Sequence, residues 1–196
     1  MKYGVDLESI IALESSAIKF GEGATVELGY EVKRRGCGNV LLLTDKNLAT
    51  LLPVEQAMES LSSESIKVTV YNKVEVEPTD RSFIAAADFA VQGSFDGIVA
   101  VGGGSVMDTA KAANLYSSYP ADFLTYVNKP IGKGVPVPGP CKPLFAVPTT
   151  AGTGSETTGV AIFDFLEMHT KTGISSRELR PVLGIVDPNH TKTLPT

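Results

Sequence analysis

Tryptophan is absent from this sequence, and cysteine and histidine occur only twice each among 196 residues. Two cysteines cannot build a disulfide framework, and Cys37 and Cys141 both lie in Gly/Pro-rich connections, so we expect free thiols in a reducing compartment. His169 and His190 have no Cys or Glu beside them at ligand spacing. This scarcity argues against a metal site made by the two histidines.

Positive charge and long apolar runs are also scarce. Lys and Arg number 17 against 22 Asp and Glu, which gives a net charge of -5 and a pI near 5.1. Nucleic-acid binding would need clustered Lys and Arg. No apolar run approaches the ~20 residues of a membrane span, and residues 1–6 contain no signal-peptide core. We expect a soluble protein with neither a nucleic-acid nor a membrane partner, located in the cytoplasm or, in a eukaryote, in the mitochondrial matrix.

The residues that are present alternate between strand and helix patterns. Apolar residues make up 43% of the chain at a mean hydropathy of +0.10, which is enough for a packed core. Strand patterns occur at 17–20, 39–44, 66–71, 98–101, 144–147, 160–165 and 183–186, and helix patterns at 24–35, from Pro53, from Pro78 and up to about Ser117. Strands separated by ~10 to 15 helical residues are typical of βαβ units. The predicted fold class is α/β, with a doubly wound, mainly parallel sheet.

The same patterns give finer predictions within a single domain that spans residues 1–196. In the 24–35 helix, Val26, Tyr30 and Val32 are expected to face inward, and Lys33-Arg34-Arg35 to form a solvated last turn. Prolines and glycines at 128–143 predict a long ordered loop or flap. Residues 1–16 are expected to be a flexible N-terminal segment.

The most informative stretch runs from Asp96 to Lys111. Ile98 to Val101 reads as a strand buried on both faces, Gly102-Gly103-Gly104-Ser105 turns the chain, and an Ala-rich helix follows. Glycines allow close backbone approach, and the first N–H groups of a helix are unpaired at the positive end of its dipole. Such a turn suits a diphosphate without any basic side chain. The alternative is a glycine-rich connection that binds nothing.

A second stretch, Pro148 to Thr158, follows another buried strand. Its five threonines and one serine offer short hydroxyl groups to ribose and phosphate oxygens. Thr153 and Glu156 have capping-box spacing, which predicts a helix from Thr153. In the alternative interpretation, these hydroxyls bond to their own backbone in a Gly-rich loop.

Asp45 directly follows the predicted strand at 39–44. A carboxylate at a strand end can accept hydrogen bonds from an adenosine ribose and repel a 2'-phosphate. It can equally cap the turn made by Lys46 and Asn47. Its position departs from the common dinucleotide-binding fingerprint, in which the acidic residue follows the glycines by ~20 residues, because here it precedes them.

Taken together, these motifs resemble those of the iron-containing (group III) alcohol dehydrogenase family. The glycine turn continues to Asp108 and Lys111 in the spacing Gly-Gly-Gly-Ser-x-x-Asp-x-x-Lys. The second motif then reads Pro148-Thr149-Thr150-x-Gly152-Thr153-Gly154-Ser155-Glu156. Leu43-Thr44-Asp45-Lys46 and Val186-Asp187-Pro188 support the resemblance, which covers nearly the whole chain from Ala17.

The resemblance implies a Rossmann-like, NAD-binding domain and gives roles to matching positions. The implied contacts are Gly102, Gly103, Gly104 and Ser105 with the diphosphate, Asp45 with the adenosine ribose, Thr149, Thr150 and Thr153 with the ribose and nicotinamide, and Lys171 with the nicotinamide ribose. Asp108 would face the nicotinamide and the substrate. Its alternative role is a first-turn carboxylate favoured by the helix dipole.

Two departures from the family pattern limit what the resemblance implies. Many relatives have an Asn that contacts the cofactor where this chain has Glu77, and a carboxylate cannot donate a hydrogen bond as an amide does. The family's metal, Fe²⁺ or Zn²⁺, is held by an Asp and three His of a helical C-terminal domain that would begin after Thr196. We therefore expect no catalytic and no metal-ligating residue in this chain, and no activity from these residues alone.

Four further stretches resemble family members that move hydride from a hydroxyacid to an oxoacid: Glu77-Pro78-Thr79-Asp80, the segment from Met107 to Tyr116, Pro130 to Gly134, and Thr157 to Asp164. The implied function is hydride transfer through bound NAD, for example from 4-hydroxybutyrate to 2-oxoglutarate, by a homo-oligomer when full length. One alternative is an NAD-dependent dehydrogenase of the same family that acts on an alcohol or aldehyde. Another is a truncated, non-catalytic nucleotide-binding module.

Overall fold

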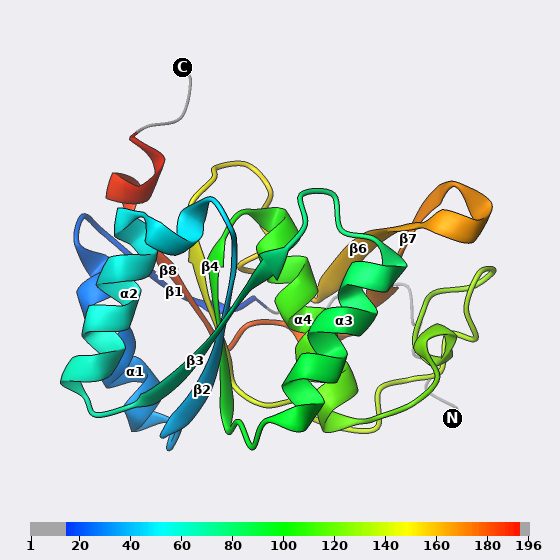
Figure 1. Cartoon of the computed structure of the whole chain (residues 1–196), viewed down its shortest axis with the longest axis horizontal. Helices are drawn as coiled ribbons and strands as arrows, with labels where there is room; N and C mark the ends of the chain where they lie inside the picture. Colours follow the sequence, from blue (N-terminus) through cyan, green and yellow to red (C-terminus); the bar gives the residue numbers. More distant parts are fainter. Residues whose placement is uncertain (1–14, 193–196) are drawn as a thin grey trace, which may run out of the picture.

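The computed structural model describes residues 15–192, which form a six-stranded sheet with helices on both sides (Figure 1). The strand order is β1-β8-β5-β4-β2-β3, and every neighbouring pair is parallel. The strands of this sheet are β1 (Ala17–Phe20), β2 (Asn39–Asp45), β3 (Lys67–Val74), β4 (Gly97–Gly102), β5 (Leu144–Pro148) and β8 (Leu183–Val186). The α-helices are α1 (Leu28–Arg34), α2 (Leu52–Ser63), α3 (Asp80–Gln92) and α4 (Gly104–Ser118). The predicted α/β class with a doubly wound, mainly parallel sheet is confirmed.

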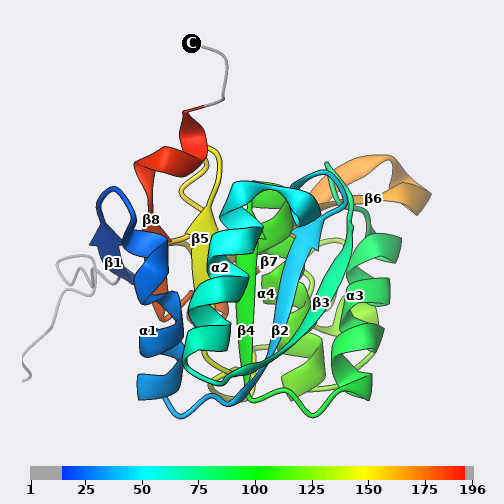
Figure 2. The same cartoon turned by 60° about the vertical axis from the view of Figure 1, so that its left-hand side comes forward.

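The alternation of side chains along each strand decides which helices cover which face. In β2, Val40 and Leu42 belong to a core shared with α1 and α2, whereas Leu41 and Leu43 belong to a second core shared with α3 and α4. All four side chains are fully buried, as predicted for a strand covered on both faces. Figure 2 shows α1 and α2 in front of the sheet, with α3 at its other side.

This arrangement opens a crevice between β2 and β4. The two strands are neighbours, yet the helix that follows β2 and the helix that follows β4 lie on opposite faces of the sheet. In open parallel sheets, ligands bind at the carboxyl ends of strands where the connections diverge in this way. Asp45 ends β2 and Gly102 ends β4, so two of the predicted site residues border this crevice. The fold is Rossmann-like in this respect.

A two-stranded antiparallel hairpin lies beside the main sheet. It consists of β6 (Val160–Phe165) and β7 (Thr170–Ser175), paired from Val160 with Ser175 to Phe165 with Thr170. The sequence did not predict β7, because Gly173 and four polar residues weaken its strand pattern. Asp164 N donates to Pro78 O at 2.8 Å, which ties the hairpin to the segment before α3.

The α-helix in the segment 24–35 is shorter than predicted, and it buries a different set of side chains. A 3₁₀ helix, η2 (Ala24–Glu27), precedes α1. Leu28 and Val32 of α1 are fully buried. The predicted inward positions of Val26 and Tyr30 are wrong, since they are 67% and 56% exposed. The switch from 3₁₀ to α geometry changes the angle between successive residues, so the apolar stripe cannot be extended back from α1.

β3 is longer than its predicted range of 66–71, because it pairs with β2 along its whole length through a local register shift. Residues 126–143 contain neither a helix nor a strand. The expectation of a flexible segment at 1–16 lies, for residues 1–14, outside the described residues. No helix within residues 15–192 is long and apolar enough to cross a bilayer.

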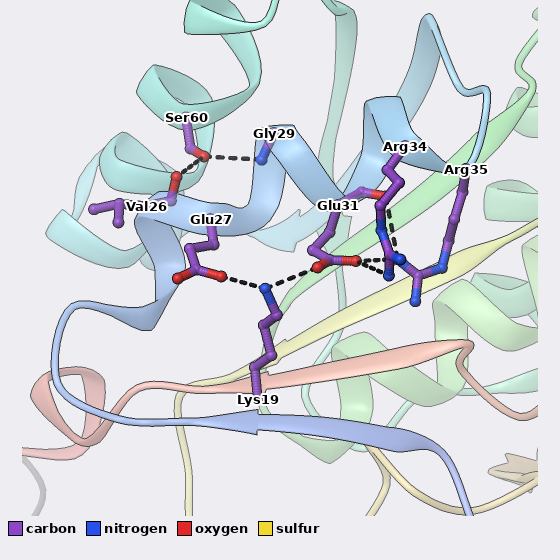
Figure 3. A network of polar contacts seen from close by, with 8 residues as sticks. All are labelled: Lys19, Val26, Glu27, Gly29, Glu31, Arg34, Arg35 and Ser60. Atoms are coloured by element: carbon purple, nitrogen blue, oxygen red, sulfur yellow. Dashed lines mark hydrogen bonds and ion pairs between the residues drawn. The ribbon is translucent and has the colours of Figure 1, made fainter.

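The basic run at the end of α1 is not simply solvated, because Arg34 and Arg35 contact a buried carboxylate (Figure 3). Glu31 is 3% exposed and pairs with Lys19 at 2.7 Å, with Arg34 at 2.9 Å and with Arg35. Burial opposes its ionisation, but hydrogen bonds from the three cations outweigh burial and lower the pKa of Glu31 from its ordinary 4.5 to about 2. Since Lys19 comes from β1, this network fastens the edge strand to α1.

We expect Glu31→Gln to lower the free energy of unfolding by about 2 kcal/mol at pH 7. Because the folded-state pKa of Glu31 is depressed, its stabilising effect is complete above about pH 5 and is lost as the pH falls towards 2. Urea unfolding at pH 7, 4 and 3 measures this, and the difference between wild type and variant should shrink by about half near pH 3. Glu59→Gln, at an exposed position of α2, is the control. A difference that stays constant with pH would contradict the prediction.

Candidate functional site

Gly102 to Ser105 connect β4 to α4 in a tight turn. A Cβ atom on Gly102 would lie 2.5 Å from Val106 Cγ2, so this position excludes a side chain. Gly103 is the N-cap of α4 and contributes no side-chain hydrogen bond, while Val106 N and Met107 N both bond to Gly103 O. The N–H groups of Gly104 and Ser105 therefore stand at the open, positive end of a 15-residue helix.

The threonine-rich loop packs closely against this turn. Thr149 N donates to Gly102 O at 3.0 Å. A Cβ atom on Gly103 would come within 3.1 Å of Thr150 Oγ1, and one on Gly104 within 3.2 Å of Thr153 Cγ2. The absence of side chains at the two glycines is what allows the two loops to approach, so the two sequence motifs form one structural unit.

The helix predicted from Thr153 is wrong. Residues 155–157 form a turn, in which Thr157 N bonds to Gly154 O at 2.9 Å. Gly152 and Gly154 adopt positive φ angles of 101° and 66°, which a helix start does not allow. Thr153 Oγ1 accepts from Ser155 N at 3.3 Å, and Thr157 Oγ1 donates to Gly154 O at 2.9 Å. The interpretation in which hydroxyls bond to their own backbone holds for these two threonines.

Asp45 caps the turn that follows β2, as the second of its two interpretations predicted. Its Oδ1 accepts hydrogen bonds from Asn47 N at 2.8 Å and from Leu48 N at 3.0 Å. Both bonds end on the same oxygen, and Asp45 is only half-buried at the crevice. The cap fixes the carboxylate while its second oxygen stays available to a ligand.

A cavity of about 470 Å³ lies at the carboxyl ends of the sheet. Six of the predicted site residues line it: Asp45, Gly103, Gly104, Ser105, Thr149 and Thr150. Its apolar lining comes mainly from η3 (Leu48–Thr50) with the start of α2, and from the end of β3: Leu48, Leu51, Leu52, Pro53, Val74 and Val76. No Lys or Arg is among its described lining residues. The N-terminus of α4 contributes positive potential to the cavity.

Asp108 and Lys111 form a buried pair that ties α4 to the hairpin. Lys111 is fully buried, and its Nζ lies 2.7 Å from Val160 O, 3.3 Å from Thr158 Oγ1 and 3.4 Å from Asp108 Oδ1. Asp108 Oδ2 accepts from Ile162 N at 3.0 Å. Burial raises the pKa of Asp108 and lowers that of Lys111, since each charge is taken out of water. In this structure the pair joins α4 to β6.

Neither Lys171 nor Glu77 lines the cavity. Lys171 projects from β7 and pairs with Asp164 at 3.1 Å, with 60% of its side chain exposed. Glu77 has a φ angle of 55°, a conformation in which Asn is common and Glu is not. Its backbone N donates to Ser105 Oγ at 3.3 Å. The cofactor roles of all ten predicted site residues stay predictions, and Lys171, Asp108, Thr153 and Gly102 do not line the cavity.

Sequence reasoning missed the part of the cavity that comes from the end of the chain. Asn189 and His190, on the 3₁₀ helix η7 (Pro188–Thr191), line it together with Glu75 from beyond β3. Asp187 anchors η7, because its carboxylate accepts from Gly23 N at 3.0 Å and Asn189 N at 3.1 Å. Their place in the sequence could have indicated them, because they also follow the carboxyl end of a parallel strand, β8. Among the described residues, no group of three His, Cys, Asp or Glu could hold a metal ion.

A parallel, doubly wound sheet with a glycine turn and an open helix N-terminus is the arrangement of Rossmann-like domains, the class to which dinucleotide-binding domains of dehydrogenases belong. Comparison with known families makes the assignment specific. Residues 15–188 match the model of the iron-containing alcohol dehydrogenase family. The chain belongs to this family.

Curated relatives and solved structures agree with this assignment. The mitochondrial hydroxyacid-oxoacid transhydrogenases of Mus musculus and Homo sapiens are each 59% identical to this chain over 181 residues. That match covers 92% of this chain but 39% of either relative. The crystal structure of a 1,3-propanediol oxidoreductase superimposes with a TM-score of 0.87 at 28% identity, over 95% of this chain and 48% of the other. The sulfoacetaldehyde reductase of Bifidobacterium kashiwanohense, solved in complex with NAD⁺, gives a TM-score of 0.83 at 27% identity over 94% and 48% of the two chains.

Proposed function

We propose that this chain is the NAD-binding part of a hydroxyacid-oxoacid transhydrogenase, which transfers hydride from a hydroxyacid to an oxoacid through bound NAD. The observation that carries the proposal is the cavity formed by the glycine turn, Thr149, Thr150 and Asp45 in a chain 59% identical to enzymes of that name. The chain spans 39% of the length of those relatives, so the proposal concerns the activity of the full-length protein.

The residues of the cavity suit the parts of a dinucleotide. Unpaired N–H groups at Gly104 and Ser105 suit a diphosphate, because the helix dipole stabilises negative charge there. Asp45 suits the adenosine ribose as a hydrogen-bond acceptor at the end of β2. Leucines of η3 and α2 provide apolar contact for a base. Bound NAD supplies the hydride acceptor and donor, while the residues of this chain hold and orient it.

A metal ion does not fit the described residues. None of their side chains forms the three-ligand group that a catalytic Fe²⁺ or Zn²⁺ would need. We therefore assign no metal-dependent step to the described residues. Any metal ligand of the full-length protein would come from other residues.

An assay of the full-length protein with paired substrates tests the proposed activity. With 4-hydroxybutyrate and 2-oxoglutarate but no added NAD, we expect one substrate to be oxidised as the other is reduced, without net formation of NADH. Turnover of simple alcohols with free NAD, and no transfer between these two acids, would instead indicate an alcohol dehydrogenase of the same family. Binding of NAD without any turnover would indicate a non-catalytic nucleotide-binding module.

We expect Asp45→Gly to weaken the preference for NAD over NADP by tenfold or more, because a carboxylate next to the ribose repels a 2'-phosphate. Asp45→Asn is the matched variant, since its amide oxygen can still accept from Asn47 N and Leu48 N while the charge is gone. Dissociation constants for both cofactors, measured by calorimetry, test this. An unchanged ratio in both variants would leave Asp45 only its turn-capping role.

We also propose a mitochondrial location for the full-length protein in place of the cytoplasmic expectation. The support is the name of the transhydrogenases from Mus musculus, Bos taurus and Homo sapiens, each of which is called mitochondrial. Fractionation of source cells with antibody detection of the full-length protein tests this, and recovery in the cytosol alone would contradict it.

A further inference from the structure

The outer face of α3 combines exposed apolar side chains with two unpaired charges. Ile84 and Val91 are 38% and 53% exposed. Arg81 and Asp88 are exposed as well, and within residues 15–192 neither forms an ion pair or a side-chain hydrogen bond. α3 lies at the outside of the molecule in both views (Figure 1, Figure 2), while its buried side chains belong to the cores shared with the sheet and α4. In the part of the chain that the structure describes, this face has no partner.

The exposed side chains form one stripe along the helix. Arg81 and Asp88 are seven positions apart, which is close to two helical turns, so their side chains leave the helix in nearly the same direction. Ile84 and Ala85 lie between the two charges, on either side of the line that joins them. A capping box at Thr79 fixes the first turn of α3. The stripe is therefore preorganised on a well-formed helix.

The order of the charges makes this stripe complementary to itself. In a contact with two-fold symmetry, residue i of one copy meets residue j of the other, and residue j meets residue i. A two-fold axis between Ile84 and Ala85 places Arg81 of each copy opposite Asp88 of the other, because the axis lies midway between the two charged positions. A parallel arrangement would instead place Arg81 opposite Arg81, which like-charge repulsion opposes. The charges thus favour an antiparallel pair of α3 helices.

The apolar residues fit the same arrangement. Ile84 of one copy meets Ile84 of the other near the axis, and the small side chain of Ala85 allows the two helices to reach the ~8–10 Å spacing of packed helices. A groove of about 260 Å³ lies beside Ile84 and Val91, between α3 and residues 120–123, and two aromatic side chains and a proline line it. Specific interfaces bury ~1,200 Å² or more in total, which requires contact beyond a single helix. The groove supplies that additional surface.

We propose that two copies of the full-length protein associate through their α3 helices, which pack antiparallel about a two-fold axis between Ile84 and Ala85. The contact surface is the stripe from Arg81 to Val91, and its partner is the same stripe of a second copy. The family resemblance implies a homo-oligomer but does not indicate which surface forms it. The proposal does not depend on the proposed cofactor or activity.

A cysteine beside the axis tests the contact in the full-length protein. Ala85→Cys brings two thiols together across the two-fold axis, so mild oxidation with diamide should join two chains by a disulfide. Glu59→Cys, at an exposed position of α2, is the matched control. We expect Ala85→Cys to form linked dimers on non-reducing gels about tenfold faster than Glu59→Cys, because association raises the effective concentration of its thiols.

Equal rates in the two cysteine variants, or no linked dimer from Ala85→Cys, would overturn the proposal. A thiol at position 85 that a small alkylating reagent cannot reach would show that the full-length chain itself covers α3. That result would overturn the proposal as well.

Charge reversal tests the two ion pairs. In the Ala85→Cys background, Arg81→Asp places carboxylates opposite each other at both ends of the contact, and Asp88→Arg places guanidinium groups there. We expect either change to slow the linking about fivefold, since two attractions become two repulsions. An equimolar mixture of the two variants should recover the original rate, because opposite charges meet again, and a chain that fails to fold could not give this recovery. Linking that neither reversal slows, or a mixture without recovery, would contradict the proposed contact.

Discussion

Gly104→Val is expected to weaken NAD⁺ binding by about 100-fold or more, because a branched side chain would occupy the space above the first-turn N–H groups of α4. A Cβ atom at this position already lies 3.2 Å from Thr153 Cγ2 and 3.5 Å from Ser155 Oγ. The additional methyl groups have only the cavity to enter or the threonine loop to displace. Either outcome removes the open helix end from the diphosphate. Calorimetric titration of the full chain with NAD⁺ and with ADP-ribose measures the loss.

The fold should survive this substitution. Gly104 does not adopt a positive φ angle, and valine costs less than glycine inside a helix. Gly21→Val is the control, because a Cβ atom there meets nothing within 4 Å and the residue lies outside the cavity. The control should retain wild-type affinity. A Gly104→Val protein that binds NAD⁺ within threefold of wild type would refute the placement of the diphosphate.

Lys111→Met is expected to lower the free energy of unfolding by about 3 kcal/mol, since it leaves the Asp108 carboxylate without its cation in a mostly buried site. Lys111 is fully buried, and its Nζ also bonds to Val160 O, so no water can replace it without rearrangement of α4 and β6. Urea denaturation at pH 7 measures the change. The hairpin should loosen first, because Lys111 and Asp108 together hold its first strand.

Two further variants show whether the charge is the cause. Asp108→Asn combined with Lys111→Met removes both charges and keeps an acceptor for Ile162 N, so we expect it to recover at least half of the lost stability. Lys171→Met breaks the exposed pair with Asp164 on the same hairpin and should cost less than about 0.5 kcal/mol. Equal losses in Lys111→Met and Lys171→Met would refute the buried-pair account.

Much of the fold was predictable because the sequence signals for it are local. Four apolar residues from Ile98 to Val101 could form only a strand covered on both faces, and they are all fully buried. Pro53 lies in the first turn of α2, whose Val54, Ala57 and Leu61 face the core. Helix periodicity and strand runs act over a few residues, so their physics can be read without knowing the partner elements.

The errors arose where tertiary contacts overrode local preference. Thr153 and Glu156 have the spacing of a capping box, but the loop is constrained by its contact with the glycine turn and adopts left-handed geometry at Gly152 and Gly154. β7 forms because β6 supplies a complete antiparallel partner, although its own strand pattern is weak. The sequence of one strand does not reveal which partner strand stabilises it.

The sequence by itself determined the chemistry of the glycine turn, the alternation of strands and helices, and the family resemblance. Only the tertiary structure decided which strand ends meet. Asp45 precedes Gly103 by 58 positions, yet both line one cavity, because β2 lies directly beside β4 in the sheet and the two strands end at the same edge. His190 reaches the same cavity from the end of the chain, because β8 runs parallel to β5. Parallel strands bring their carboxyl ends to one edge whatever their separation in sequence, and that geometry assembled the site.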